Sequence, residues 1–187
     1  FFTTLILGHV LKGRPQRLFL LAASYYFYGV FEPFYLVLIL FSTAWDYVAG
    51  IAITSRRNWE QNGGLPSLLA RLPAKTYLIG SVLVNLALLG YFKYTNFGIT
   101  ILNDVHPLGS SMFAFPAESI LLPVGISFYT FQSMSYTMDV YRGVLEARRD
   151  PVAFALYVTF FPQLVAGPIV RATTFLEQLD QGYSIKK

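Results

Sequence analysis

Cysteine is absent from this chain of 187 residues, which excludes disulfides, thiolate nucleophiles and cysteine-ligated zinc. Histidine is scarce: His9 and His106 lie in unrelated segments, and neither has partners at the spacing of a metal site. No glycine motif for phosphate or dinucleotide binding is present. Residues 125–129 (GISFY) begin like a nucleophile elbow but lack its second glycine. The sequence therefore predicts no metal centre, and local motifs alone do not establish an enzyme.

Charged residues are also scarce, at 13%, whereas 55% of the residues are hydrophobic and the mean hydropathy is +0.50. A soluble domain of this size could not bury so much apolar surface, so we expect an integral membrane protein in contact with the lipid bilayer. The net charge is +4, but the basic residues fall in separate short clusters between apolar runs. This distribution argues against nucleic acid binding and is typical of cytoplasmic loops.

Four apolar runs are predicted to be membrane-spanning helices, since a span needs roughly 20 apolar residues. They cover residues 18–31, 34–53, 77–102 and 120–140. Glu32-Pro33 separates the first two runs and predicts a helical hairpin, because proline disfavours helix in the residue before it. The fold class is therefore all-α, a polytopic transmembrane helix bundle. Residues 1–11 are interpreted as the remnant of an earlier span, and a chain that opens on Phe1 is expected to be a fragment.

Lys and Arg alternate between the loops, which predicts the orientation because basic loops stay in the cytoplasm. Residues 12–17 hold three, residues 54–75 four and residues 141–150 three, whereas residues 32–33 and 103–119 hold none. Asp104, His106 and Glu118 are accordingly expected outside.

The last apolar stretch, residues 154–170, is expected to be broken. Pro162 interrupts it and Gly167-Pro168 ends it. Irregular backbone at membrane depth is tolerated only where it is buried in protein or lines a wet cavity. We therefore expect a re-entrant segment that returns Arg171 and residues 186–187 to the cytoplasm.

Asp46 and Lys93 lie within apolar runs, where charged residues are candidates for function. Their depths differ, at about 12 Å and about 25 Å from the inner ends of their helices, so they are not expected to pair. Lys93 is predicted to reach the outer interface among aromatic residues. Asp46 is predicted to face the bundle interior, either as a hydrogen-bonded structural carboxylate or as a functional group.

The fourth run carries a polar face with steps of three and four residues. Its members are Gly125, Tyr129, Gln132, Ser135, Tyr136, Asp139 and Arg142. Lipid would not accept this face, so it must contact other helices or line a water-filled cavity. Asp139 and Arg142 would lie near the cytoplasmic mouth of such a cavity.

Two long motifs carry a family resemblance: LPVGISFYTFQSMSYTMDVYRG at residues 122–143 and FALYVTFFPQLVAGPIVR at residues 154–171. Together with ASYYFYG at residues 23–29 and YFKYTNF at residues 91–97, they resemble the bacterial membrane-bound O-acyltransferase (MBOAT) family. Within that family the chain is most similar to the alginate O-acetylation branch. The resemblance runs in order through nearly the whole chain, as the N-terminal part of one transmembrane domain.

The resemblance implies a multi-pass enzyme of the bacterial inner membrane that moves an acyl group, expected to be acetyl, from a cytoplasmic donor to hydroxyls of an exported polysaccharide. It implies acetyl-CoA or another acyl donor as cosubstrate, no tightly bound cofactor, and periplasmic or extracellular polysaccharide-acetylation proteins as partners. The family's catalytic histidine is expected beyond Lys187, in the catalytic C-terminal part. This chain alone is therefore expected to be inactive.

The resemblance also marks positions expected to shape the reaction chamber and its cytoplasmic entrance. They are Gln132, Tyr136, Asp139, Tyr141, Arg142, Gln163 and Arg171, with Pro162, Gly167 and Pro168 as a structural motif. Packing alone is the alternative role for each. The broken segment and the intramembrane charges are also typical of a transporter or channel, and a non-catalytic scaffold of an export complex is the third reading.

Overall fold

A computed structural model describes residues 13–31, 33–62, 71–105, 122–123, 125–167 and 170–181. Every regular element in these ranges is an α-helix. The helices are α2 (Arg14–Phe31), α3 (Pro33–Asn62), α4 (Ala74–Val105), α5 (Ile126–Arg142), α6 (Pro151–Thr159), α7 (Phe161–Ala166) and α8 (Ala172–Gln181).

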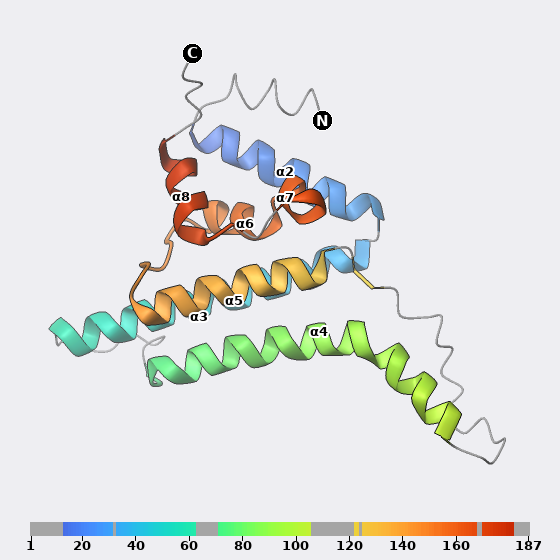
Figure 1. Ribbon diagram of the computed structural model, residues 1–187. Helices are drawn as coiled ribbons and strands as arrows, with labels where there is room; N and C mark the ends of the chain where they lie inside the picture. Colours follow the sequence, from blue (N-terminus) through green and yellow to red (C-terminus); the bar gives the residue numbers. More distant parts are fainter. Residues whose placement is uncertain are drawn as a thin grey trace.

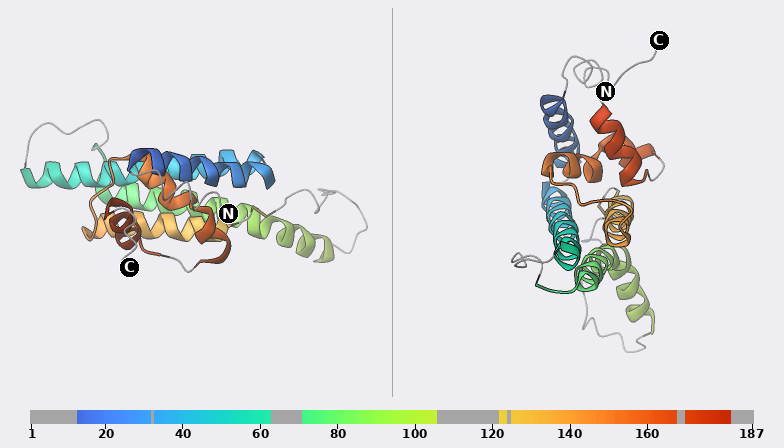
Figure 2. Two further views of the ribbon diagram at one scale, coloured as in Figure 1. Left: turned by 90° about the horizontal axis from the view of Figure 1, so that it is seen from above. Right: turned by 90° about the vertical axis from the view of Figure 1, so that its left-hand side faces the viewer.

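The helices form three layers (Figures 1 and 2). Helices α3 and α5 lie side by side in the middle layer, α4 covers one face, and α2, α6, α7 and α8 lie on the other. The long helices run back and forth along one direction, so the starts of α2, α4 and α6 and the ends of α3 and α5 share one end of the bundle. We call this the basic end, because it carries Arg14, Arg17, Arg56, Arg57, Lys75, Arg142 and Arg148.

The first three predicted runs each lie inside a helix. The hairpin is confirmed: α2 ends at Phe31, α3 begins at Pro33, and the two helices pack together. The prediction that the fourth helix begins at residue 120 is wrong. Residues 122–123 are not helical, and α5 begins only after Gly125, whose φ of 76° lies in the left-handed region that favours glycine.

Two helices, Pro33–Asn62 and Ala74–Ile101, are long and apolar enough to cross a membrane. Helix α4 buries little of its apolar window inside the protein, at 17%. Leu83 and Phe97, for example, are exposed on its surface. An apolar surface of this extent needs a cover of lipid or protein.

Asp46 of α3 lies at the centre of the packing between α3, α4 and α5, fully buried. Its Oδ1 accepts a hydrogen bond from Ser81 Oγ at 2.6 Å, and its Oδ2 accepts one from Asn85 Nδ2 at 2.8 Å. Ser133 of α5 donates to the same Oδ2. One carboxylate thus connects three helices, and the prediction that Asp46 faces the interior is confirmed.

Lys93 lies apart from this network. Its side chain is exposed, and its Nζ lies 5.6 Å from the centre of the Tyr94 ring. None of the ion pairs among the described residues joins it to Asp46. The prediction that these two charges do not pair is therefore confirmed.

The break predicted within residues 154–170 is present between α6 and α7. Phe160 is extended, and Pro162 stands in the first turn of α7, where its missing N–H is least harmful. The freed N–H of Phe161 points to Ser24 Oγ at 3.5 Å. Helix α7 ends after six residues with Gly167 N–H donating to Gln163 O at 2.9 Å. A Cβ on Gly167 would lie 2.9 Å from Gln163 Cα, so only glycine fits there.

After this break the chain returns to the basic end. Asp180, near the end of α8, contacts Arg17 at the start of α2 and Arg148 in the loop before α6. Helix α8 crosses the direction of the long helices there (Figure 1). Segment 151–180 therefore enters the bundle and comes back, rather than running through it.

Replacing Asp46 with alanine should destabilise the protein by at least about 3 kcal/mol, because the donors Ser81, Asn85 and Ser133 would lose their acceptor in a dry interior. The thermal unfolding midpoint of detergent-purified protein, followed by circular dichroism, measures this. Val48→Ala is the control, since Val48 is exposed on the same helix. Equal midpoints for the two variants would contradict the role given to Asp46.

Candidate functional site

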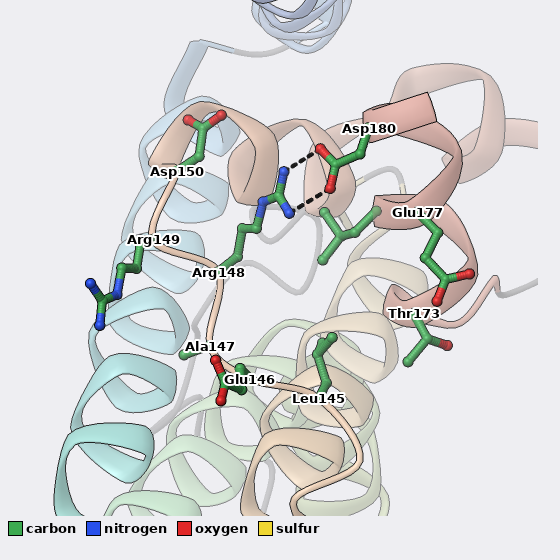
Figure 3. Close-up of a pocket in the computed structure, with 10 residues that line it drawn as sticks. Leu145, Glu146, Ala147, Arg148, Arg149, Asp150, Thr173, Glu177 and Asp180 are labelled. Carbon is green, nitrogen blue, oxygen red and sulfur yellow. Dashed lines mark hydrogen bonds and ion pairs between the residues drawn. The ribbon is translucent and has the colours of Figure 1, made fainter. Parts of the chain in front are cut away.

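Two cavities lie against α8. The first, which we call the polar pocket, measures about 460 Å³ (Figure 3). It is lined by Leu145, Glu146, Ala147, Arg148, Arg149, Asp150, Thr173, Leu176, Glu177 and Asp180. The second, the apolar groove, measures about 400 Å³. It is lined by Gln16, Leu20, Leu156, Phe160, Pro162, Gln163, Gly167, Val170, Phe175, Gln178 and Leu179.

Helix α8 is the wall between the two cavities. Thr173, Leu176, Glu177 and Asp180 line the polar pocket, at the spacing of one helix face. Phe175, Gln178 and Leu179 line the apolar groove from the other side. The amphipathic pattern of α8 also buries Ala172 and Leu176 against the bundle. A shift of this one helix would change the shape of both cavities.

An ionic cluster holds the end of α8. Arg148 contacts both carboxylate oxygens of Asp180, with Nη1 to Oδ2 at 2.7 Å (Figure 3). Arg17 Nη2 donates to Asp180 Oδ1 at 3.0 Å, and Arg17 Nη1 donates to Asp150 Oδ2 at 3.0 Å. The hydrogen bond from Arg148 holds the pKa of Asp180 below its usual range, with a smaller contribution from Arg17. Arg17 thereby joins α2, α6 and α8 at the basic end.

The polar pocket is not a cationic phosphate site. Four carboxylates line it, and its arginine Arg148 is already paired with Asp180. Arg149 points away from the cavity in Figure 3. The polar pocket is therefore a charged contact region between α8 and the loop that joins α5 to α6.

The apolar groove contains three of the motif positions that the resemblance marked: Pro162, Gln163 and Gly167. The side chain of Gln163 is 7% exposed, and aromatic and aliphatic side chains form most of the remaining wall. Gln16 and Gln178 add two more amides. An apolar groove with a few amides suits a largely apolar chain that carries amide groups.

Gln132 and Tyr136 lie elsewhere, in the contact between α5 and α6. Gln132 Nε2 donates to Tyr157 O at 2.7 Å, and Tyr136 Oη accepts from Arg148 N at 2.9 Å. Tyr136 also packs on Phe154 with ring centres 4.5 Å apart. These two residues fasten α5 to the segment that precedes the break.

The remaining predicted positions do not line either cavity. Asp139 is half-buried, while Tyr141, Arg142 and Arg171 are exposed. Neither Asp139 nor Arg142 takes part in the ion pairs of the described residues. Pro168, His9 and His106 lie outside the residues that the structure describes.

Sequence reasoning missed two features of this region. Ser81 and Ser133, which donate to Asp46, are hydroxyl residues inside two other apolar runs. A hydroxyl inside an apolar run was the signal from which these partners could have been found. Helix α8 was missed because residues 172–181 follow the apolar runs, although Phe175, Leu176 and Leu179 recur at helical spacing.

Comparison with curated proteins connects the chain to acetyl-transfer enzymes. It is 39% identical to the "Probable alginate O-acetylase AlgI" of Pseudomonas putida over 181 residues, which cover 96% of this chain and 35% of that protein. It is 40% identical to the protein of the same name from Pseudomonas aeruginosa, covering 96% of this chain and 32% of the relative. The chain belongs to the alginate O-acetylase branch of the MBOAT family. The family resemblance drawn from the motifs is thereby confirmed.

A third relative carries a different name. The chain is 30% identical to the "Peptidoglycan O-acetyltransferase" of Helicobacter pylori, with 87% of this chain and 32% of the relative covered. The chain thus spans about a third of the length of these curated relatives. No family model and no solved structure matches it.

Replacing Asp180 with Asn should loosen α8, because the contacts with Arg148 and Arg17 lose their charge. Asp180 is partly exposed, and ion pairs in contact with solvent contribute little to stability. We therefore expect a cysteine at position 176 to be labelled only about fivefold faster in the Asp180→Asn variant than in the protein that keeps Asp180. Since the pKa of Asp180 is lowered in the folded protein, its contribution is complete above the unfolded value near 4 and disappears as the pH falls through the folded value. Relative to a fully exposed cysteine labelled at the same pH, the labelling rate of the Asp180→Asn variant should therefore not respond to this acid transition.

The chain has no native cysteine, so Leu176→Cys is a unique label site. Glu177→Gln is the control, because Glu177 is exposed on α8 and takes part in none of the ion pairs described. If both variants change the labelling rate equally, the ionic cluster does not hold α8.

Proposed function

We propose that the complete protein is a membrane O-acyltransferase, which moves an acetyl group from a cytoplasmic donor to hydroxyls of an exported polysaccharide. The observation that supports this function is the 38–40% identity to proteins named alginate O-acetylases over 96% of the chain. The printed names of these relatives describe acetyl transfer, and the match covers both long motifs.

In this proposal the protein is a multi-pass protein of the bacterial inner membrane, with the basic end of the bundle in the cytoplasm. The concentration of Lys and Arg at this end supports the orientation, because basic segments are retained on the cytoplasmic side. Segment 151–180 is then re-entrant: α6 enters the membrane, the chain turns at Phe160 and Gly167, and α8 returns. The contacts of Asp180 with Arg17 and Arg148 support this path.

The donor side of the reaction is assigned to the apolar groove. The groove lies between the first turns of α2, the broken segment and α8. In this proposal the donor enters it from the basic end. A thioester donor such as acetyl-CoA carries its acetyl group on a slender arm with two amide units, which suits this lining. Gln163 is the side chain placed to bind such an amide inside the groove. Residues beyond those described would supply the general base.

The acceptor is a glycan hydroxyl handled at the opposite end, with the help of polysaccharide-acetylation proteins outside the membrane. Two of the relatives differ in the polymer that their names give, alginate in one and peptidoglycan in the other. The shared chemistry is transfer to a sugar hydroxyl. The decisive experiment supplies membranes that contain the complete protein with labelled acetyl-CoA and each glycan, and measures acetyl ester formation. Uptake of the glycan or donor without ester formation would indicate a transporter instead.

The orientation predicts opposite labelling of two engineered cysteines. Asn62→Cys lies at the basic end of α3, and Thr100→Cys lies near the other end of α4; both positions are exposed. In intact cells a membrane-impermeant maleimide should label Thr100→Cys from outside, whereas Asn62→Cys should react only after the membrane is opened. The reverse pattern would refute the assignment of the basic end to the cytoplasm.

Gln163→Leu should raise the KM for the acetyl donor about tenfold in the complete protein, because a buried hydrogen bond to the donor is lost at nearly constant side-chain volume. Steady-state rates at varied acetyl-CoA measure this, and the amount of protein in the membrane should not change. Gln61→Leu is the matched control at an exposed position of α3. A fall in protein amount that equals the fall in activity would assign Gln163 to packing.

A further inference from the structure

The carboxylate of Asp180 lies between two arginine side chains. Arg148 Nη1 donates to Oδ2 at 2.7 Å and Arg148 Nη2 contacts Oδ1, so one guanidinium group contacts both carboxylate oxygens (Figure 3). Arg17 Nη2 donates to the same Oδ1 at 3.0 Å. Paired N–H donors of this kind bind phosphate as well as carboxylate. The place that Asp180 occupies therefore also suits a phosphate group.

The same contacts join two walls of the apolar groove. Gln16 and Leu20 line the groove from α2, and Leu179 lines it from α8. Arg17 stands beside Gln16 on α2, and its Nη2 also donates to Leu179 O at 3.3 Å. Asp180 follows Leu179 directly in the chain. The contacts of Arg17 therefore hold α8 against α2, and the width of the groove depends on them.

The last turn of α8 has little else to hold it. Among the described side chains of this helix, only Ala172 and Leu176 are buried. Phe175 packs against Phe160 with ring centres 5.6 Å apart. These contacts fasten the first half of α8, whereas Asp180 fastens its end. A helix of ten residues has little stability of its own, so loss of the Asp180 contacts would release this end.

Arg17 has a further donor that Asp180 does not use. Its Nε is buried and has no hydrogen-bond partner among the described residues. Buried N–H groups in folded proteins are nearly always paired. Both oxygens of Asp180 already accept from guanidinium groups, whereas a phosphate group offers three acceptor oxygens. A phosphate in place of Asp180 could therefore satisfy more of these donors than the carboxylate does.

We propose that Asp180 occupies the place of a phosphate group of the acyl donor. When the donor binds, its phosphate pairs with Arg148 and Arg17, Asp180 is released, and the end of α8 moves away from α2. The apolar groove then opens for the acyl arm, while Arg17 Nη1 keeps its contact with Asp150. This inference rests on the proposed function, in which the donor is a thioester such as acetyl-CoA. It adds the residues that recognise the donor's phosphate and the contact that keeps the groove closed without it.

The test measures binding of adenosine 3′,5′-bisphosphate, the end of acetyl-CoA without its arm, to the complete protein in nanodiscs by isothermal titration calorimetry. Arg148→Gln should weaken binding about tenfold, because a charge-assisted contact with phosphate is lost. Asp180→Asn should strengthen binding about fivefold, because the competing carboxylate is removed. Misfolding cannot explain changes in opposite directions.

Each variant has a matched control. Arg149→Gln removes an arginine that points away from the polar pocket in Figure 3. Glu177→Gln removes an exposed carboxylate of α8 that takes part in none of the ion pairs described. Both controls should bind the bisphosphate like the wild type. Unchanged or weaker binding by Asp180→Asn would overturn the proposal. Equal affinity for inorganic phosphate and the bisphosphate would overturn the assignment to the donor.

Kinetics with two donors separate this inference from the proposed function. Acetylpantetheine carries the same thioester arm without phosphate, so Arg148→Gln should raise the KM of acetyl-CoA but not that of acetylpantetheine. Asp180→Asn should lower the KM of acetylpantetheine about fivefold, because the groove is then open without a phosphate. If the binding results hold but no acetyl group is transferred, the proposed function fails and the exchange of Asp180 for phosphate stands. If acetyl transfer occurs and neither variant changes either KM, the inference fails alone.

Discussion

The Asp46 carboxylate is the contact on which the arrangement of the long helices depends. Apolar side chains alone would let α3, α4 and α5 slide or rotate against one another with little penalty, because the alternative contacts are equally apolar. Ser81, Asn85 and Ser133 remove that freedom, since each reaches the Asp46 carboxylate only in one register. The position of α5 relative to α3 follows from this register, and α5 in turn positions Gln132, Tyr136 and Tyr129.

A second constraint comes from the broken segment. Pro162 ends α6, and Gly167 permits a turn so tight that any side chain would collide with Gln163. The chain can therefore return within a few residues, and the ionic cluster around Asp180 fixes where it arrives. This return creates the apolar groove, because α8 closes a space that α2 and α6 leave open. The irregular backbone at Pro162 and Gly167 and the ion pairs of Asp180 together form the apolar groove. A regular helix through this segment would have filled that space.

Much of the fold could be predicted from the sequence, because the patterns involved are local. Long apolar runs located α2, α3 and α4, and Pro162 with Gly167 located the break. The start of α5 was placed six residues too early, since residues 120–125 are apolar and the positive φ of Gly125 is not a hydropathy signal. Which residues of different helices bond to one another was harder to predict than where the helices lie. Asp46 could be assigned to the interior, but several runs carry hydroxyls, and only packing decides that Ser81 and Ser133 reach it.

The candidate site, too, has a part that follows from local sequence and a part that depends on packing. Gln163, Pro162 and Gly167 are close in sequence, and they share one groove. Gln132, Tyr136, Asp139 and Arg142 follow a single face by count, yet burial separates them: Gln132 and Tyr136 are buried, Asp139 is half-buried, and Arg142 in the last turn of α5 is exposed. Inside the bundle, Gln132 Oε1 has no hydrogen-bond partner among the described residues, whereas Tyr136 Oη accepts from Arg148 N. The apolar groove borders the break between α6 and α7, so the motif positions Pro162, Gln163 and Gly167 are grouped where the backbone is irregular.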